Sequence, residues 1–168
     1  MDIKDLTFLK MQKVSFVVIV ACLAAIFVSG FDVIMAKSRD TKRRVDIKII
    51  SKALNLYYDK YGIFPEGEDE WQGWDLSYNF DNFGPDFLDI LSKEGFLEGN
   101  SFDPLNNADY HYRYQKYPAG SYGCKKPFYI LQVSSFELLT EDVGFGSCPE
   151  INWPEFATNG YSLLEFEF

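Results

Sequence analysis

The sequence has few of the residues from which most catalytic and metal sites are built. It contains one histidine and three cysteines in 168 residues. The histidine, His111, stands within an alternating tyrosine segment, where we expect a surface imidazole rather than a catalytic base. No Cys or carboxylate motif accompanies it, and no glycine-rich phosphate loop follows a predicted strand, so neither a His-based triad nor a nucleotide site is indicated. The sequence predicts a non-enzymatic protein without a cofactor.

Basic residues are scarce over most of the chain. From Val45 onward there are 8 Lys and Arg against 21 Asp and Glu. Nucleic-acid binders need a basic surface, so this balance excludes nucleic acid as a partner. Five basic residues gather instead in a short cluster, Lys37, Arg39, Lys42, Arg43 and Arg44. We expect this cluster to form a collar that contacts anionic lipid headgroups, with an ordinary solvated helix turn as the alternative.

Charge is absent from the stretch Val14–Phe31. As a helix its eighteen residues would be about 27 Å long, close to the roughly 30 Å of a bilayer's hydrocarbon core. It is apolar on every face, unlike most helices of soluble domains. We therefore expect a leader over residues 1–13 and a transmembrane helix over residues 14–36, with a buried core helix as the alternative. The predicted anchor positions are Val14, Val18, Cys22, Ile26 and Phe31.

Two signals disagree on which side of the membrane the remaining residues lie. The stronger basic cluster follows the apolar stretch, which favours a cytoplasmic C-terminal domain. In contrast, Cys124 and Cys148 lie in loop-like sequence without metal-ligand clustering. Such a pair indicates one disulfide and therefore an oxidising compartment. Two unrelated reduced thiols are the alternative.

The residues after the apolar stretch have the periodicity of an amphipathic helix. Apolar residues recur at intervals of three and four, at Ile47, Ile50, Leu54, Tyr57 and Tyr61. Gly62 is expected to cap the helix in a left-handed conformation, because Pro65 prevents its continuation. No Pro or Gly interrupts residues 31–61. The apolar and amphipathic segments together predict one helix of about 45 to 50 residues.

Later segments predict a short helix and a small antiparallel sheet. Pro85 and Gly95 favour a helix over residues 85–94, because proline is common in the first turn of a helix and glycine just after its end. Tyrosines alternate with polar residues over 110–115, and residues 127–133 read as a second strand. Residues 136–140 extend that strand or form a third, and residues 161–168 form a terminal strand or a docking tail. The predicted fold class is α+β, with the long N-terminal helix packed on the sheet.

Three segments follow one another in the chain, AKSRDTKRRVDIKIISKALNLYYDKYGIFP, FLDILSKEGFLEGNSFDPLN and YHYRYQKYPAGSYGCKKPFYILQV. In this order they resemble the type IV pilin superfamily, in particular the major pseudopilins of type II secretion. The resemblance implies a non-enzymatic, single-pass subunit of the inner membrane with a lollipop shape and an extracytoplasmic globular domain. It also implies self-association, or association with similar subunits, in a cell-surface filament or a secretion assembly. The implied domain covers residues 37–168, with a helix over 37–61, a loop and short helix over 62–95, and a sheet with the C-terminal segment over 108–168.

The chain departs from the pilin pattern at two places. Gly30-Phe31 forms the end of the apolar stretch, whereas the prepilin cleavage site precedes such a stretch. Glu141 and Asp142 do not reproduce the calcium loop of major pseudopilins, so no metal ligand is predicted there. The acidic loop Glu66–Asp75 offers oxygen ligands and keeps calcium as an alternative to a solvated loop.

Three other interpretations remain open. Ile19 to Cys22 matches a lipobox, and cleavage before Cys22 would give a lipid-anchored domain. Trp71 and Trp74 could stack on sugars, which would fit a tethered extracytoplasmic binding module for glycans or cell-surface partners. An exported enzyme of an unrecognised type is the third.

Overall fold

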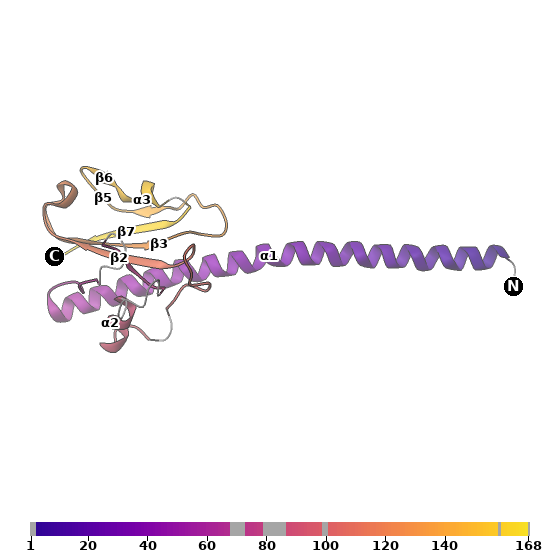
Figure 1. Ribbon diagram of the computed structural model, residues 1–168, viewed down its shortest axis with the longest axis horizontal. Coiled ribbons are helices and arrows are strands. Elements are labelled where there is room, and N and C mark those ends of the chain that lie inside the picture. The colour runs from indigo at the N-terminus through magenta and orange to yellow at the C-terminus, as the bar shows by residue number, and fades with distance from the viewer. Residues whose placement is uncertain (1–2, 68–72, 79–86, 99–100, 158, 168) are drawn as a thin grey trace. The chain divides into compact units, whose positions relative to one another are not determined.

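The protein is an α+β chain with one long helix and a small sheet (Figure 1). The computed structural model describes residues 3–67, 73–78, 87–98, 101–157 and 159–167, except for the side chains of residues 3–12 and 23–29. The helices are α1 (Ile3–Tyr61), α2 (Phe87–Lys93) and α3 (Trp153–Phe156), with a 3-10 turn, η1 (Ser121–Gly123). The strands are β1 (Asp75–Leu76), β2 (Tyr112–Tyr117), β3 (Phe128–Val133), β4 (Gly144–Phe145), β5 (Ser147–Cys148), β6 (Ile151–Asn152) and β7 (Tyr161–Phe166).

The chain divides into two units, residues 1–38 and residues 39–168. The first unit consists of the N-terminal part of α1, which is helical over the predicted leader as well as over the apolar stretch. Among the residues that the structure describes, no helix has both the length and the apolar character needed to cross a membrane. Within the predicted span of residues 14–36, the side chains of 23–29, including Ile26, lie outside that description.

In the second unit α1 is amphipathic, as its sequence predicts. Ile47, Ile50 and Leu54 are buried and face the sheet. The helix ends at the predicted place, where Gly62 has a φ of 73° and its N–H donates to the carbonyl oxygen of Tyr58 at 2.7 Å. The helix is longer than the predicted length of about 45 to 50 residues, because α1 has 59 residues.

The main sheet has five strands in the order β1-β2-β3-β7-β4. All neighbouring pairs are antiparallel except β4 and β7, which are parallel, so the sheet is mixed rather than purely antiparallel as expected. The parallel contact needs glycine, because a Cβ on Gly144 would lie 1.8 Å from the carbonyl oxygen of Ser162. A smaller antiparallel pair, β5 and β6, forms a separate sheet.

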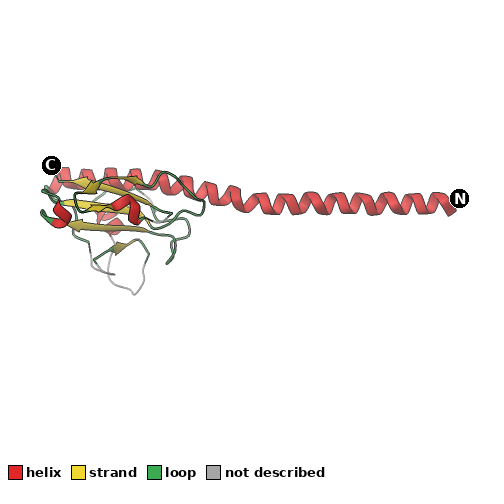
Figure 2. Cartoon of the chain, turned by 90° about the horizontal axis from the view of Figure 1, so that it is seen from above, coloured by secondary structure: helices red, strands yellow, loops and turns green. Residues whose placement is uncertain are grey.

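Strand β3 organises the core of the second unit, because all six of its residues are buried. Successive side chains of a strand point to opposite faces. Tyr129 and Leu131 accordingly pack with α1 and α2, while Phe128 and Ile130 pack with Trp153 of α3 and the cysteine pair. Figures 1 and 2 show the strands of this sheet lying along the C-terminal part of α1. The unit therefore has a helix layer, a sheet, and a smaller second layer.

Some predicted element bounds need correction. Residues 136–140 form neither a strand nor an extension of β3, because two of their backbone N–H groups are bonded to a helix side chain, as described below. The helix predicted over 85–94 is α2, and residues 85–86 lie outside the described part of the chain. The terminal segment is a strand, β7, and it lies inside the sheet rather than at its edge.

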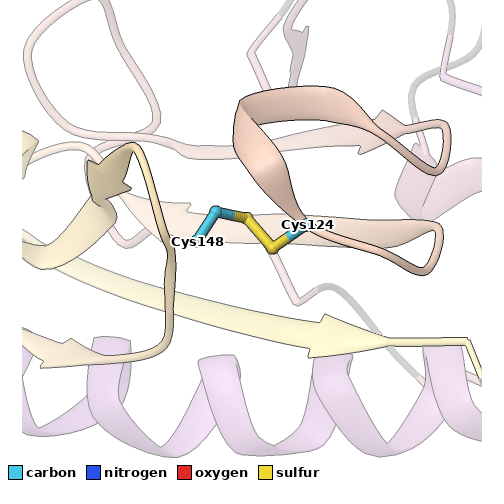
Figure 3. The surroundings of a disulfide bond; sticks show 2 residues. All are labelled: Cys124 and Cys148. Atoms are coloured by element: carbon cyan, nitrogen blue, oxygen red, sulfur yellow. A yellow bond between two sulfur atoms is a disulfide. The ribbon is translucent and has the colours of Figure 1, made fainter.

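The predicted disulfide is confirmed. Cys124 and Cys148 are bonded, with their Cα atoms 5.1 Å apart (Figure 3). Cys124 follows η1 in the loop between β2 and β3, and Cys148 ends β5. Both side chains are buried in the cluster that also contains Trp153. The bond therefore joins the β2–β3 loop to the segment that precedes β7.

Breaking this bond should destabilise the second unit. The cysteines are 24 residues apart, and closing a loop of that length contributes about 3 kcal/mol in the chain-entropy model. We expect the Cys124→Ser/Cys148→Ser variant to lose about that much free energy of unfolding in urea titrations followed by circular dichroism. The matched control is Cys22→Ser, which removes an exposed free thiol and should change nothing. Two alkylatable thiols in unreduced Cys22→Ser protein would contradict the pairing.

Candidate functional site

The N-terminal part of α1 exposes an unusual amount of apolar surface. Its described side chains that are large, apolar and exposed range from 40% exposed at Met35 to 69% at Phe16. The full set is Val14, Phe16, Val17, Val18, Ile19, Val20, Phe31, Val33, Ile34 and Met35, which we call the apolar helix surface. Contiguous exposed apolar patches mark sites of association with proteins or membranes. The apolar helix surface is therefore the first candidate interaction site.

Four of the five predicted anchor positions lie on exposed helix. Val14, Val18 and Phe31 belong to the apolar helix surface, and Cys22 is an exposed free cysteine. Ile26 lies outside the described side chains.

Most side chains of the basic cluster predicted to contact headgroups form ion pairs within the second unit. The Arg43 side chain is fully buried. Its Nε donates to Asp103 Oδ2 at 2.6 Å and its Nη2 donates to Asp103 Oδ1 at 3.1 Å. A third donor, Nη1, reaches Asp40 at 2.6 Å. A guanidinium held in this way cannot contact lipid, so the headgroup role predicted for Arg43 is wrong.

Glu137 extends the network toward the loop after β3. It accepts hydrogen bonds from Arg39 Nε at 2.7 Å and from Arg43 Nη1 at 2.9 Å. Asp40 of α1 binds the same loop directly. Its carboxylate accepts hydrogen bonds from the backbone N–H groups of Glu137 and Leu138, both at 3.0 Å. These two N–H groups would be needed for a ladder, which is why this loop is not a strand. The group Arg39, Asp40, Arg43, Asp103 and Glu137 is called the Arg43 network below.

The network keeps its charges despite burial. Burial alone would lower the pKa of Arg43, but hydrogen bonds to Asp103, Glu137 and Asp40 raise it above its ordinary value. The hydrogen bond from Arg39, reinforced by Arg43, lowers the pKa of Glu137 to about 2. Both partners are therefore ionised at neutral pH, as a buried ion pair requires.

The other members of the basic cluster also have partners nearby. Arg44 pairs with Asp142 at 2.7 Å and also donates to Thr140. Lys42 pairs with Asp46, whose carboxylate accepts the hydroxyl of Tyr112 as well. Lys37, in the first unit, is exposed. Arg39, Arg43 and Arg44 consequently attach loops of the second unit to α1.

A groove of about 470 Å³ lies along the outer side of α1 in the second unit. Lys48, Lys52 and Leu56 line it from the helix, and Phe145 and Leu163 line it from the sheet. It is the second candidate interaction site, because Leu56 and Phe145 are exposed apolar side chains.

A cavity of about 490 Å³ lies beside His111 and is lined also by Asp109, Arg113 and Ser134. The predicted surface imidazole is in fact buried, and this burial lowers the pKa of His111, which favours the neutral ring. Its Nδ1 lies 3.1 Å from the carbonyl oxygen of Asn107. The Ser134 hydroxyl accepts the backbone N–H of His111 and donates to the carbonyl oxygen of Asp109. The ring and the hydroxyl are thus each bonded to main chain, not to one another.

The predicted sugar-stacking and calcium-binding loop is only partly described. Trp71 lies outside the described residues, as do the three acidic residues at 68–70. Trp74 packs against Trp153 with ring centres 6.4 Å apart and carries the Arg113 guanidinium 4.4 Å above its ring. Asp75 is buried in β1. A search of the described residues for three or more metal-ligating side chains in one place finds none.

Removing the Arg43 charge should be costly. Arg43→Met keeps the aliphatic bulk but leaves the carboxylates of Asp103, Asp40 and Glu137 without their shared partner. Breaking a buried pair in this way costs about 3–5 kcal/mol. We expect that loss in the free energy of unfolding in urea. Arg44→Met is the matched control and should cost at most about 1 kcal/mol, because its pair with Asp142 is largely exposed. Equal losses in the two variants would contradict the burial of the network.

The same network predicts acid sensitivity. Since folding lowers the pKa of Glu137 to about 2, its contribution to stability is present above the ordinary glutamate pKa of about 4.3 and is lost as pH falls toward 2. The difference in unfolding free energy between the natural protein and Glu137→Gln should therefore shrink between about pH 4.5 and pH 2. Denaturant titrations at four or five pH values would measure it. A difference independent of pH over this range would show that the carboxylate is not stabilised in the folded state.

Comparison with known proteins adds no relative. A scan against protein-family models, a search of curated proteins and a search of solved structures each find no match to this chain. The function is therefore inferred from the residues and contacts described above.

Proposed function

We propose that this protein is a non-enzymatic structural subunit of the pilin-like kind. In this proposal the N-terminal part of α1 is held by lipid before assembly and by other copies afterwards, and the second unit lies outside the cytoplasm. The observation that carries the proposal is the apolar helix surface, whose large side chains are exposed over residues 14–20 and 31–35 of a helix that continues into a folded unit.

Exposure of these side chains to water is unfavourable. Fully burying one Val, Ile, Phe or Met side chain contributes about 1.5–3 kcal/mol. Ten such residues lie on the apolar helix surface, so covering even half of their area favours association strongly. Lipid chains and the helices of other copies both provide an apolar environment for a helix of this kind. A structural subunit can therefore be stored in a membrane and assembled without new chemistry.

Two further observations support an extracytoplasmic assembly subunit. The disulfide between Cys124 and Cys148 fits an oxidising compartment, whereas cytosolic thiols are usually kept reduced. The order of long helix, short helix and tyrosine-rich hairpin resembles major pseudopilins, which favours a subunit of a type II secretion assembly or a pilus-like filament. The Arg43 network also fits a structural role, because it attaches segments around residues 103 and 137 to α1.

The proposal is tested by placing one charge on the apolar helix surface. A lysine near the centre of an apolar helix costs about 3 kcal/mol on insertion, which is on the order of 100-fold in partitioning. We expect the full-length protein to float with lipid vesicles, and to form large sedimenting assemblies when detergent is removed. Val18→Lys should reduce both by at least about tenfold.

The matched control for this experiment is Leu139→Lys. Leu139 is 93% exposed and belongs to the second unit, so the same apolar-to-charged change there should affect neither flotation nor sedimentation. A natural protein that stays monomeric after detergent removal and does not float would overturn the proposed function.

A further inference from the structure

One side of α1 in the second unit exposes several apolar side chains. Val45, Ile49 and Leu56 are 49%, 44% and 40% exposed, and their spacing places them on one side of the helix. The groove of about 470 Å³ lies beside this stripe, with Phe145 and Leu163 on its far wall. A helix can lie along such a surface with its apolar side chains in the groove.

Two lysines give the groove a charge. Lys48 and Lys52 line it one helical turn apart, and both are exposed. Neither has an ion pair among the described residues. Asp59 lies on the same wall, further toward the end of α1. The groove thus fits an apolar segment that carries a negative charge opposite the two lysines.

The chain itself contains a segment with this chemistry. Asp32 is the single charged residue between Val14 and Ala36. It is exposed, and it lies among exposed apolar neighbours, Phe31, Val33, Ile34 and Met35. Any association that buries this segment also buries the Asp32 carboxylate, which is costly unless a cation accompanies it. The lysine pair in the groove supplies that cation.

We propose that the groove binds the Phe31–Met35 segment of a second copy of this chain, with Asp32 of that copy placed between Lys48 and Lys52. The inference rests on the proposed function, because it specifies the contact through which copies associate. The two surfaces are different parts of the chain, so the contact is heterologous. Repetition of a heterologous contact produces a closed ring or an open array, and an open array leaves one unused surface of each kind at its ends.

Charge exchange tests the pairing. In the full-length chain, Lys48→Glu/Lys52→Glu places three carboxylates together, and Asp32→Lys places three ammonium groups together. Each should reduce assembly after detergent removal by about tenfold or more, measured as sedimenting protein at fixed concentration. The combination Asp32→Lys/Lys48→Glu/Lys52→Glu restores opposite charges and should recover most of the assembly.

The matched control is Lys125→Glu/Lys126→Glu, which makes the same change of charge on an exposed loop away from the groove. It should assemble as the natural protein does. Recovery in the combined variant also rules out misfolding, since all the substituted side chains are exposed.

Each failure has a distinct meaning. If the natural protein assembles and Lys48→Glu/Lys52→Glu matches the loop control, the inference is overturned and the proposed function stands. If the two charge changes each weaken assembly but their combination does not restore it, the lysines and Asp32 are not partners and the inference again fails. A natural protein that neither assembles nor floats would overturn the proposed function and this contact with it.

Discussion

The second unit depends on one buried guanidinium. Arg43 has no exposed side-chain surface, yet it meets carboxylates from its own helix and from two segments remote in the sequence. Each of these ions alone would be expensive to bury, and together they satisfy one another. Because each ion is satisfied only when its partners are in place, α1, the turn at Asp103 and the loop at Glu137 adopt one mutual arrangement. Apolar packing supplies the bulk of the stability, while the ions select the geometry.

The two faces of the sheet are stabilised by different contacts. Tyr129 and Leu131 secure the inner face of β3 against the helices, and Phe128 and Ile130 secure the outer face against α3 and the disulfide. The disulfide therefore constrains the layer that has the smaller apolar cluster. The helix layer has no cross-link and relies on packing and on the Arg43 network.

Local patterns predicted the longer elements α1, α2, β2, β3 and β7, but they missed the short elements β1, β4, β5, β6 and α3 and the partners of side chains. The spacing of Ile47, Ile50 and Leu54 is a property of one helix, and the alternation before Gln115 is a property of one strand, so both could be recognised without tertiary structure. The partners of Arg43 lie 60 and 94 residues away, and no local pattern reports such distances. The basic cluster was consequently interpreted through its charge alone. A large acidic excess in the same domain was the available signal that internal partners existed.

The position of β7 in the sheet determines when this unit can fold. β7 follows every other strand in the sequence, yet it is inserted between β3 and β4 and supplies Leu163 and Leu164 to the two apolar clusters. Until the ribosome has released residues 161–166, β3 has one unpaired edge and both clusters are incomplete. Non-local pairings of this kind form late and slowly. The core of the unit is therefore completed by the strand that comes last in its sequence.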